Sequence, residues 1–178
     1  MRLKDFLIVS NYAIENGFQE ALQHVKRPLK VGGVETPSTL NDLSLGELMQ
    51  LQGILSEREM ILVPCKVLLG LDERKVMNSD AHDVLAFVFW TAREVERINK
   101  LFASTNVPPT PEEKQAGADK MNFGMFGIVD YYAQRMGITD HEAVEHVPWV
   151  RVYKCLDMDA QRARMDRRLR KILERRKK

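Results

Sequence analysis

The chain has 178 residues, 27 basic and 25 acidic, and 44% of its residues are apolar. This length fits one domain or a domain with a long arm, and the apolar content can form a buried core, so a chain disordered throughout is excluded. Two cysteines, Cys65 and Cys155, are too few for a disulfide scaffold or a thiolate metal site.

Charge is distributed unevenly along the chain. Residues 161–178 carry ten basic and two acidic residues, a net charge of +8, which leaves −6 for residues 1–160. The basic residues of this tail are Arg162, Arg164, Arg167, Arg168, Arg170, Lys171, Arg175, Arg176, Lys177 and Lys178. The nearly neutral total therefore combines an acidic body with a basic end.

The N-terminal region contains no long apolar segment. Its longest apolar run, Phe6–Val9, has four residues, whereas a secretory signal needs a longer run. Along the whole sequence, no stretch approaches the roughly 20 apolar residues of a membrane-spanning helix. We therefore expect a cytoplasmic protein without a membrane-spanning helix.

The first forty residues predict a helix and a small hairpin. Apolar residues recur at helical spacing between Ile14 and Val25, and Pro28 ends that pattern. Phe6–Val9 fits either a helix or a short buried strand. Gly32 and Gly33 separate two short apolar–polar runs, which fits a hairpin near residues 29–36 or an exposed loop.

The next segments predict helices around a proline. Ser44 and Glu47 are spaced as a capping box for a helix that continues to Leu55. The apolar run "MILVPCKVLLGLD" is interrupted by Pro64, and it fits a strand followed by a helix or two short helices. The longest helix pattern begins after Asp80 or Ser79, either of which can cap it, and ends near Phe102.

A proline-rich linker, residues 103–111, precedes the C-terminal helices. Thr110, Pro111 and Glu113 give a strong helix start. The helix after it should end at Gly137, and Thr139 is spaced three residues before Glu142 for another capping box.

The predicted fold class is therefore mostly α. We expect a compact multi-helix domain with at most one small β-hairpin near residues 29–36 and a basic C-terminal helix. Its parts are residues 1–102, the linker 103–111, a second helical part 112–160 and the basic tail 161–178.

The motifs with chemical potential favour structural roles. His141 and His146 in "HEAVEH" are five apart and fall on different helical faces, so no metal site is expected. Gly124 and Gly127 match no nucleotide-binding pattern and fit close packing against another helix. No serine or cysteine lies in a nucleophile motif. We therefore expect no enzyme activity, no cofactor and no metal.

The basic tail also carries an apolar stripe, formed by Met165, Leu169, Ile172 and Leu173 at helical spacing. A purely electrostatic nucleic-acid arm does not need such a stripe, and a membrane-binding helix usually adds aromatic anchors. The stripe favours docking on a protein, which includes self-association with the acidic body of a second copy. Nucleic-acid binding through the tail remains the alternative.

The order of these segments resembles the tail assembly chaperones of tailed bacteriophages and prophages. The resemblance is carried by "LNDLSLGELMQLQGI", "REVERINKLF" and above all residues 110–156, where a Gly/aromatic helix, the break "GITD" and a Trp-centred segment follow one another.

The resemblance implies a small helical protein, without enzyme activity, that binds the tape-measure protein, the tail-tube protein or both in the cytoplasm of the host bacterium. A virion structural or connector protein is a related alternative. The candidate partner-binding residues are Met121, Met125, Phe126, Met136, Trp149, Met165, Leu169, Ile172 and Leu173.

Overall fold

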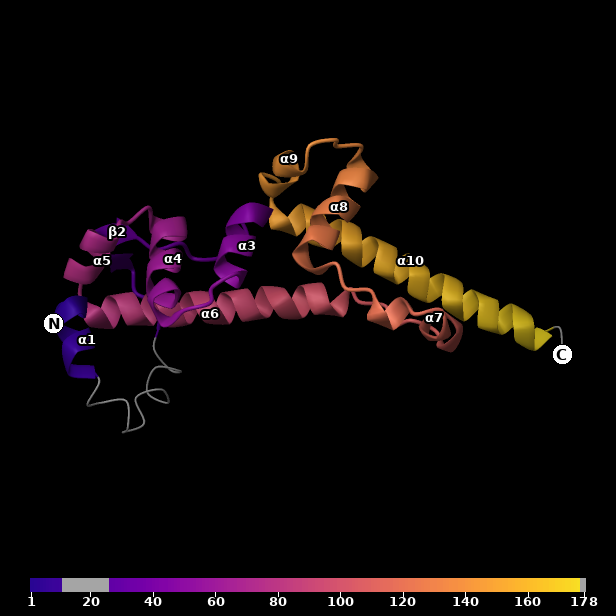
Figure 1. The fold of residues 1–178 in the computed structure, drawn as a ribbon, viewed down its shortest axis with the longest axis horizontal. Helices are drawn as coiled ribbons and strands as arrows, with labels where there is room; N and C mark the ends of the chain where they lie inside the picture. Colours follow the sequence, from indigo (N-terminus) through magenta and orange to yellow (C-terminus); the bar gives the residue numbers. More distant parts are fainter. Residues whose placement is uncertain (11–25, 177–178) are drawn as a thin grey trace. The chain divides into compact units, whose positions relative to one another are not determined.

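The structure, a computed structural model, describes residues 1–10 and 26–176. It is mostly helical with one small antiparallel hairpin, which confirms the predicted fold class (Figure 1). The chain forms two compact units. The N-terminal unit comprises Met1–Leu40 and Glu47–Arg97, and the C-terminal unit comprises Asn41–Gly46 and Ile98–Lys178. The helix predicted between Ile14 and Val25 lies outside the described residues.

The predicted hairpin is present in the N-terminal unit. Its strands are β1 (Lys30–Val31) and β2 (Val34–Glu35), and Val31 is opposite Val34. The two residues between them, Gly32 and Gly33, have φ values of 56° and 84°. This left-handed pair forms the tight turn that matches the twist of antiparallel strands, and glycine adopts it without a Cβ clash.

The N-terminal unit also contains α1 (Leu3–Ser10), most of α3 (Leu45–Gln52), α4 (Glu57–Leu69) and α5 (Glu73–Asn78). Residues 6–9 are thus helical rather than extended. Ser44 directly precedes α3 and forms an isolated bridge with Pro148 within the C-terminal unit.

The break predicted at Pro64 is wrong, because α4 is one helix with Pro64 inside it. The helix starts at a capping box that we did not predict: Ser56 accepts from the Glu59 amide, and the Glu59 carboxylate accepts from the Ser56 amide. Pro64 is buried in the core-facing part of the helix. Tertiary packing and a strong N-terminal cap therefore override the local cost of an internal proline.

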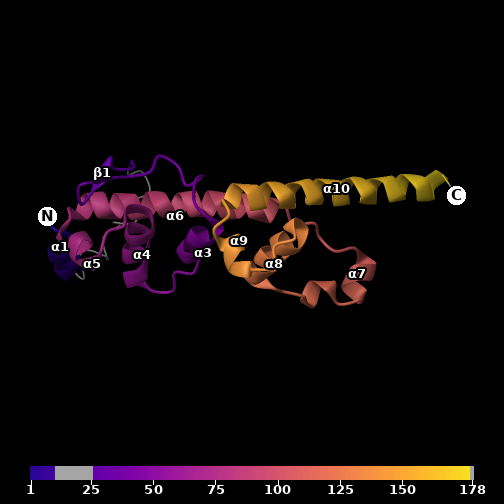
Figure 2. The ribbon, with the colours of Figure 1, turned by 90° about the horizontal axis from the view of Figure 1, so that it is seen from above.

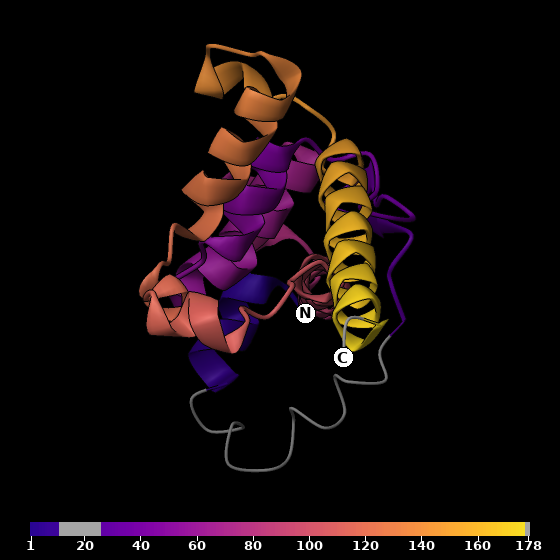
Figure 3. The ribbon, with the colours of Figure 1, turned by 90° about the vertical axis from the view of Figure 1, so that its right-hand side faces the viewer.

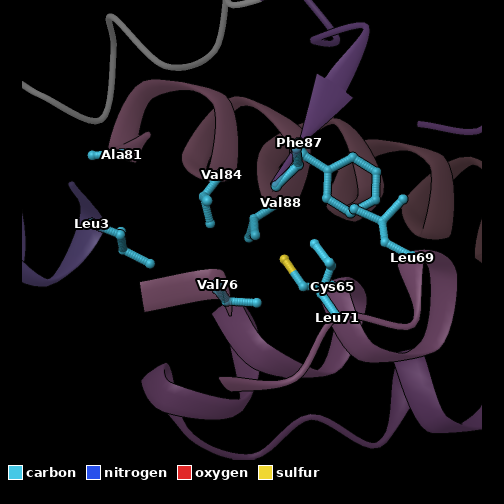
Figure 4. Packing of buried hydrophobic residues seen from close by; sticks show 10 residues of the cluster. Leu3, Cys65, Leu69, Leu71, Val76, Ala81, Val84, Phe87 and Val88 are labelled. Carbon is cyan, nitrogen blue, oxygen red and sulfur yellow. The ribbon is translucent and has the colours of Figure 1, made fainter. Parts of the chain in front are cut away.

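The core of the N-terminal unit lies where α1, α4 and α5 meet the first half of α6 (Ala81–Ser104) (Figures 1 and 4). Phe87 on α6 is fully buried and clusters with Cys65 of α4 and Val76 of α5. Burial raises the pKa of the Cys65 thiol to about 12. Cys65 therefore behaves as a small core residue rather than a reactive thiol.

The predicted cap of α6 is confirmed. Asp80 Oδ1 accepts from the amide of His82 at 2.9 Å, so the helix starts one residue after the capping aspartate. The last turns of α6, from Ile98, belong to the C-terminal unit.

The C-terminal unit continues with five further elements: α7 (Pro111–Gln115), the short 3-10 helix η1 (Ala118–Lys120), α8 (Gly124–Met136), α9 (His141–Glu145) and α10 (Trp149–Arg176). The capping box of Thr110 and Glu113 and the stop at Gly137 are confirmed. The box predicted for Thr139 and Glu142 is wrong, because Asp140 caps α9 instead.

The core of the C-terminal unit forms around the start of α10. Trp149 is 2% exposed and packs against Phe102 and Tyr153, with ring centroids 6.0 and 6.3 Å away. The Trp149 amide donates to the Leu43 carbonyl, and the Leu45 amide donates to the Val147 carbonyl. The segment before α3 and the entry to α10 therefore form one backbone-linked structure.

None of the helices in the described part of the chain combines the length and apolar character that crossing a bilayer requires.

Candidate partner-binding surface

The most extended exposed apolar feature of the described residues lies on α10. Met158, Met165, Leu169, Ile172 and Leu173 are each 47–48% exposed. At about 100° per residue, these five positions fall within an arc of about 100° on the helix. We call this set the α10 stripe. Four of its members were predicted from the sequence, and Met158 was missed. Met158 precedes Met165 by seven residues, a spacing that places both on the same helical face.

The α10 stripe faces away from the rest of the C-terminal unit. The buried residues of α10, which are Trp149, Val152 and Ala160, fall on the opposite side of the helix. Figure 3, in which α10 is the yellow helix, shows α7, α8 and α9 all to one side of it. Figures 1 and 2 show the last turns of α10 extending past α7. From residue 168 to residue 176 every side chain is exposed.

The arginines of the predicted basic tail divide into two groups. Arg164 donates to the carbonyls of Ser104 and Asn106 at 2.5 and 3.2 Å. Arg167 donates to the Pro108 carbonyl and pairs with Glu113 at 3.0 Å. These two cations hold the middle of α10 to the end of α6 and the start of α7.

The remaining cations are oriented toward solvent. Arg162 pairs with Asp159 on its own helix at 3.6 Å while remaining 64% exposed. Within the part of α10 that the structure describes, the following cations are exposed and make no ion pair or hydrogen bond: Arg168, Arg170, Lys171, Arg175 and Arg176. The free positive charge is thus concentrated in the last two to three turns.

A second group of exposed apolar side chains surrounds the start of α8. Met121 and Phe126, both predicted, are 63% and 61% exposed, and Phe123, which was not predicted, is 65% exposed. Met136 at the end of α8 is 47% exposed, whereas Met125 is half-buried. Phe126 also meets the His141 ring edge-on, with centroids 5.1 Å apart.

The glycines of α8 have a different role from the predicted helix–helix packing. Gly124 has a φ of 54°, so it supplies a left-handed residue at the helix start. A Cβ on Gly127 would lie 2.7 Å from Phe123 Cβ. Gly127 therefore makes room for the Phe123 side chain of its own helix start rather than for another helix.

Trp149 does not belong to an exposed partner-binding surface, contrary to the prediction. Its indole is buried in the core of the C-terminal unit, and its neighbours Phe102 and Tyr153 surround it. In the sequence, Trp149 directly follows Pro148 at a predicted helix start. This pattern is equally compatible with an interface residue and with a core residue.

A polar cluster joins α8 to α10. Tyr131 donates to Asp159 Oδ2 at 2.5 Å, and Arg135 pairs with the same oxygen. The hydrogen bond from Tyr131, followed by that from Arg135, lowers the pKa of Asp159. Burial, followed by the Asp159 hydrogen bond, raises the pKa of Tyr131 to about 12. The three groups satisfy one another, so the cluster works as an inter-helix link.

His141 of the histidine motif has other neighbours in the structure. Its Nε2 lies 3.5 Å from Asp130 Oδ1, and its ring meets that of Phe126. Among the described residues, Asp80, His82 and Asp83 form a group whose possible ligand atoms lie within 4.8 Å of one another. Asp80 already accepts the amide of His82 there, so this group is explained by the N-terminal cap of α6.

A shallow apolar groove of about 440 Å³ lies within the C-terminal unit, on the inner side of α10. Phe102, Ile128 and Leu156 supply its walls from α6, α8 and α10. Asp159, the one acidic residue in its lining, is already held by Tyr131 and Arg135. The groove therefore offers apolar contact rather than a set of free ionisable groups.

The chain matches no protein-family model, no curated protein and no solved structure.

Proposed function

We propose that this protein is a non-enzymatic assembly factor that binds another polypeptide through the exposed apolar side chains of its C-terminal unit. The single observation that carries the proposal is their distribution. Thirteen large apolar residues are exposed among the described residues, and nine of them lie on the C-terminal unit, five on α10 and four on or just before α8. Apolar surface concentrated in this way is typical of protein-binding sites.

The residue types of these surfaces fit a helical or extended client. Four of the nine exposed side chains on the C-terminal unit are the methionines Met121, Met136, Met158 and Met165. Methionine is unbranched and polarizable, so it adapts to partners of differing shape. In its specific form, the proposal is a phage or prophage tail assembly chaperone that covers the tape-measure protein, the tail-tube protein or both until the tail tube forms. The resemblance of residues 110–156 supports this form.

The test is co-expression of the tagged full-length chain with the tape-measure protein or the tail-tube protein encoded near its gene. We expect a complex that co-purifies and elutes as one species in size-exclusion chromatography. Solubility of the client should depend on the presence of this chain. If neither client associates at low or high salt, the proposal is wrong.

The second candidate function is nucleic-acid binding, and the specific observation that favours it is the run of exposed, unpaired cations from Arg168 to Arg176. Binding of this kind depends steeply on salt because condensed counterions are released from the phosphates. Deleting residues 168–178 should abolish it. If the full-length chain does not bind duplex or single-stranded nucleic acid at low salt, this candidate is excluded.

A further inference from the structure

We infer that the outer face of α10 is a docking surface for an amphipathic helix of another polypeptide, one whose apolar stripe is bordered by aspartate and glutamate. This inference rests on the proposed function and adds to it the site and the chemistry of the partner.

The geometry of the α10 stripe fits a helix as its occupant. From Met158 to Leu173 the stripe spans about 22 Å at 1.5 Å per residue, which is the contact length of two to three heptads. Met158, Met165 and Ile172 are spaced by seven residues, so the stripe drifts slowly around the helix by about 20° per heptad. A second helix that crosses at about 20° follows such a drift along its whole length.

The charges beside the α10 stripe select an acidic occupant. Arg168 and Arg175 follow one border, and Arg170 lies beside the other, whereas Arg162 falls within the arc of the stripe. Asp157 and Asp166 also border the stripe, so its edges become more basic toward the C-terminal end. Because Arg164 and Arg167 are turned inward to Ser104 and Glu113, they do not contribute to these borders.

The same charges disfavour pairing of two α10 helices. Residues 168–176 contain five basic residues and one acidic residue. A side-by-side pair of these segments would place like charges along both edges, which opposes association. The apolar contact is therefore better satisfied by a helix of opposite border charge.

The stripe also distinguishes this surface from a phosphate-binding arm. Nucleic-acid contacts need cations alone, and five half-exposed apolar side chains add nothing to them. An anionic membrane surface would use both cations and stripe, but interfacial helices are typically anchored by tryptophan or phenylalanine, and the α10 stripe has neither.

The direct test uses a designed peptide as the probe. The peptide has about 21 residues, or three heptads, with leucine in the apolar stripe and glutamate on both borders. A matched peptide carries lysine in place of glutamate. Fluorescence anisotropy measures the binding of each to the full-length protein. We expect the acidic peptide to bind and the lysine peptide to bind at least roughly tenfold more weakly.

Two variants separate apolar contact from charge. L169Q/I172Q removes two stripe side chains without changing the charge, and it should weaken binding of the acidic peptide by roughly tenfold or more. R168Q/R175Q should weaken binding and reduce its dependence on salt. Leu55→Gln is the matched control, because Leu55 is an apolar residue of the N-terminal unit that is 94% exposed. Circular dichroism verifies that each variant retains its helix content.

Several outcomes would overturn the inference. They are equal binding of the two peptides, wild-type binding by L169Q/I172Q, or binding of a DNA duplex or of phosphatidylserine vesicles in place of the acidic peptide. Loss of self-association in L169Q/I172Q with unchanged peptide binding would assign the stripe to a second copy and also overturn it.

The outcomes for the proposed function are distinct. If a tape-measure or tail-tube complex survives L169Q/I172Q, the proposed function stands and this docking surface is wrong. If the acidic peptide binds as expected but neither client associates with the wild-type chain, the docking surface stands and the proposed function is wrong.

Discussion

Asp159 is the residue on which the link between α8 and α10 depends, because it accepts from both Tyr131 and Arg135. Replacing it by asparagine keeps the size but removes the charge that both donors favour. We expect Asp159→Asn to lower the free energy of unfolding at pH 7 by about 1 kcal/mol, since the site is partly exposed. Asp157→Asn is the control, because Asp157 lies on the same helix and accepts a hydrogen bond from Gln161 of that helix rather than from α8. Urea denaturation measures both.

The same carboxylate predicts a pH dependence. The pKa of Asp159 is lower in the folded protein than in the unfolded chain. Its stabilising contribution is therefore fully present above the unfolded pKa of about 4 and is lost as the pH falls through the folded value. The difference in unfolding free energy between wild type and Asp159→Asn should shrink on acidification from pH 7 to below pH 4. A difference that stays constant with pH would contradict the role of the charge.

Gly127 provides a second prediction for a single residue. Alanine in place of glycine usually stabilises a helix by up to about 1 kcal/mol, but here the new Cβ would meet Phe123 Cβ at 2.7 Å. We expect Gly127→Ala to destabilise the protein by about 1 kcal/mol instead. The control is a double-mutant cycle: in a Phe123→Gly background the clash is absent, so Gly127→Ala should become stabilising. Thermal unfolding of the four proteins measures the cycle.

At the scale of elements, the ends of the helices were the best predicted features. Thr110, Pro111 and Glu113 form the predicted start of α7, and Gly137 ends α8. These signals are local, because a cap needs only residues three or four apart. The cap of α9 was predicted wrongly, because such local signals do not distinguish between neighbouring residues. Thr139 and Asp140 can both cap this helix, and their spacing alone does not show that Asp140 does so.

Features that depend on tertiary contacts were not readable from the sequence. Pro64 lies inside α4 because the core around Cys65 and Phe87 stabilises that helix as one unit. Trp149 is buried because the segment around Leu43 and the end of α6 enclose it. The sequence also did not show which arginines of the tail contact the rest of the C-terminal unit and which face solvent. Nothing in their spacing shows that Arg167 reaches Glu113, 54 residues earlier, while its neighbour Arg168 faces solvent.

That pair of arginines gives a prediction for the proline-rich connection between α6 and α7. Arg167 holds the Pro108 carbonyl and Glu113, so Arg167→Gln should loosen residues 104–115 and speed their amide hydrogen exchange several-fold. Arg168→Gln removes the same charge from an exposed neighbour and should leave that exchange unchanged. Hydrogen-exchange mass spectrometry compares the two variants. Equal acceleration in both would show that net charge, rather than the contact, orders the connection.

At the scale of the whole molecule, the main feature is the separation of negative and positive charge along the chain. Residues 1–160 carry −6 and residues 161–178 carry +8. Within the C-terminal unit, Arg162, Arg164 and Arg167 have hydrogen-bond or ion-pair partners. The cations of residues 168–176 remain exposed, so they are available to the acidic body of a second copy.

We therefore expect weak self-association that depends on salt. Exposed charges are screened over about 10 Å at 0.1 M ionic strength and about 3 Å at 1 M, so association should decrease across that range. Multi-angle light scattering measures the average mass at each salt concentration, and a chain that lacks residues 168–178 is the control. A full-length chain that is monomeric at low salt would contradict the prediction. Association that strengthens with salt would also contradict the prediction. It would show that apolar contact, rather than charge attraction, brings the copies together.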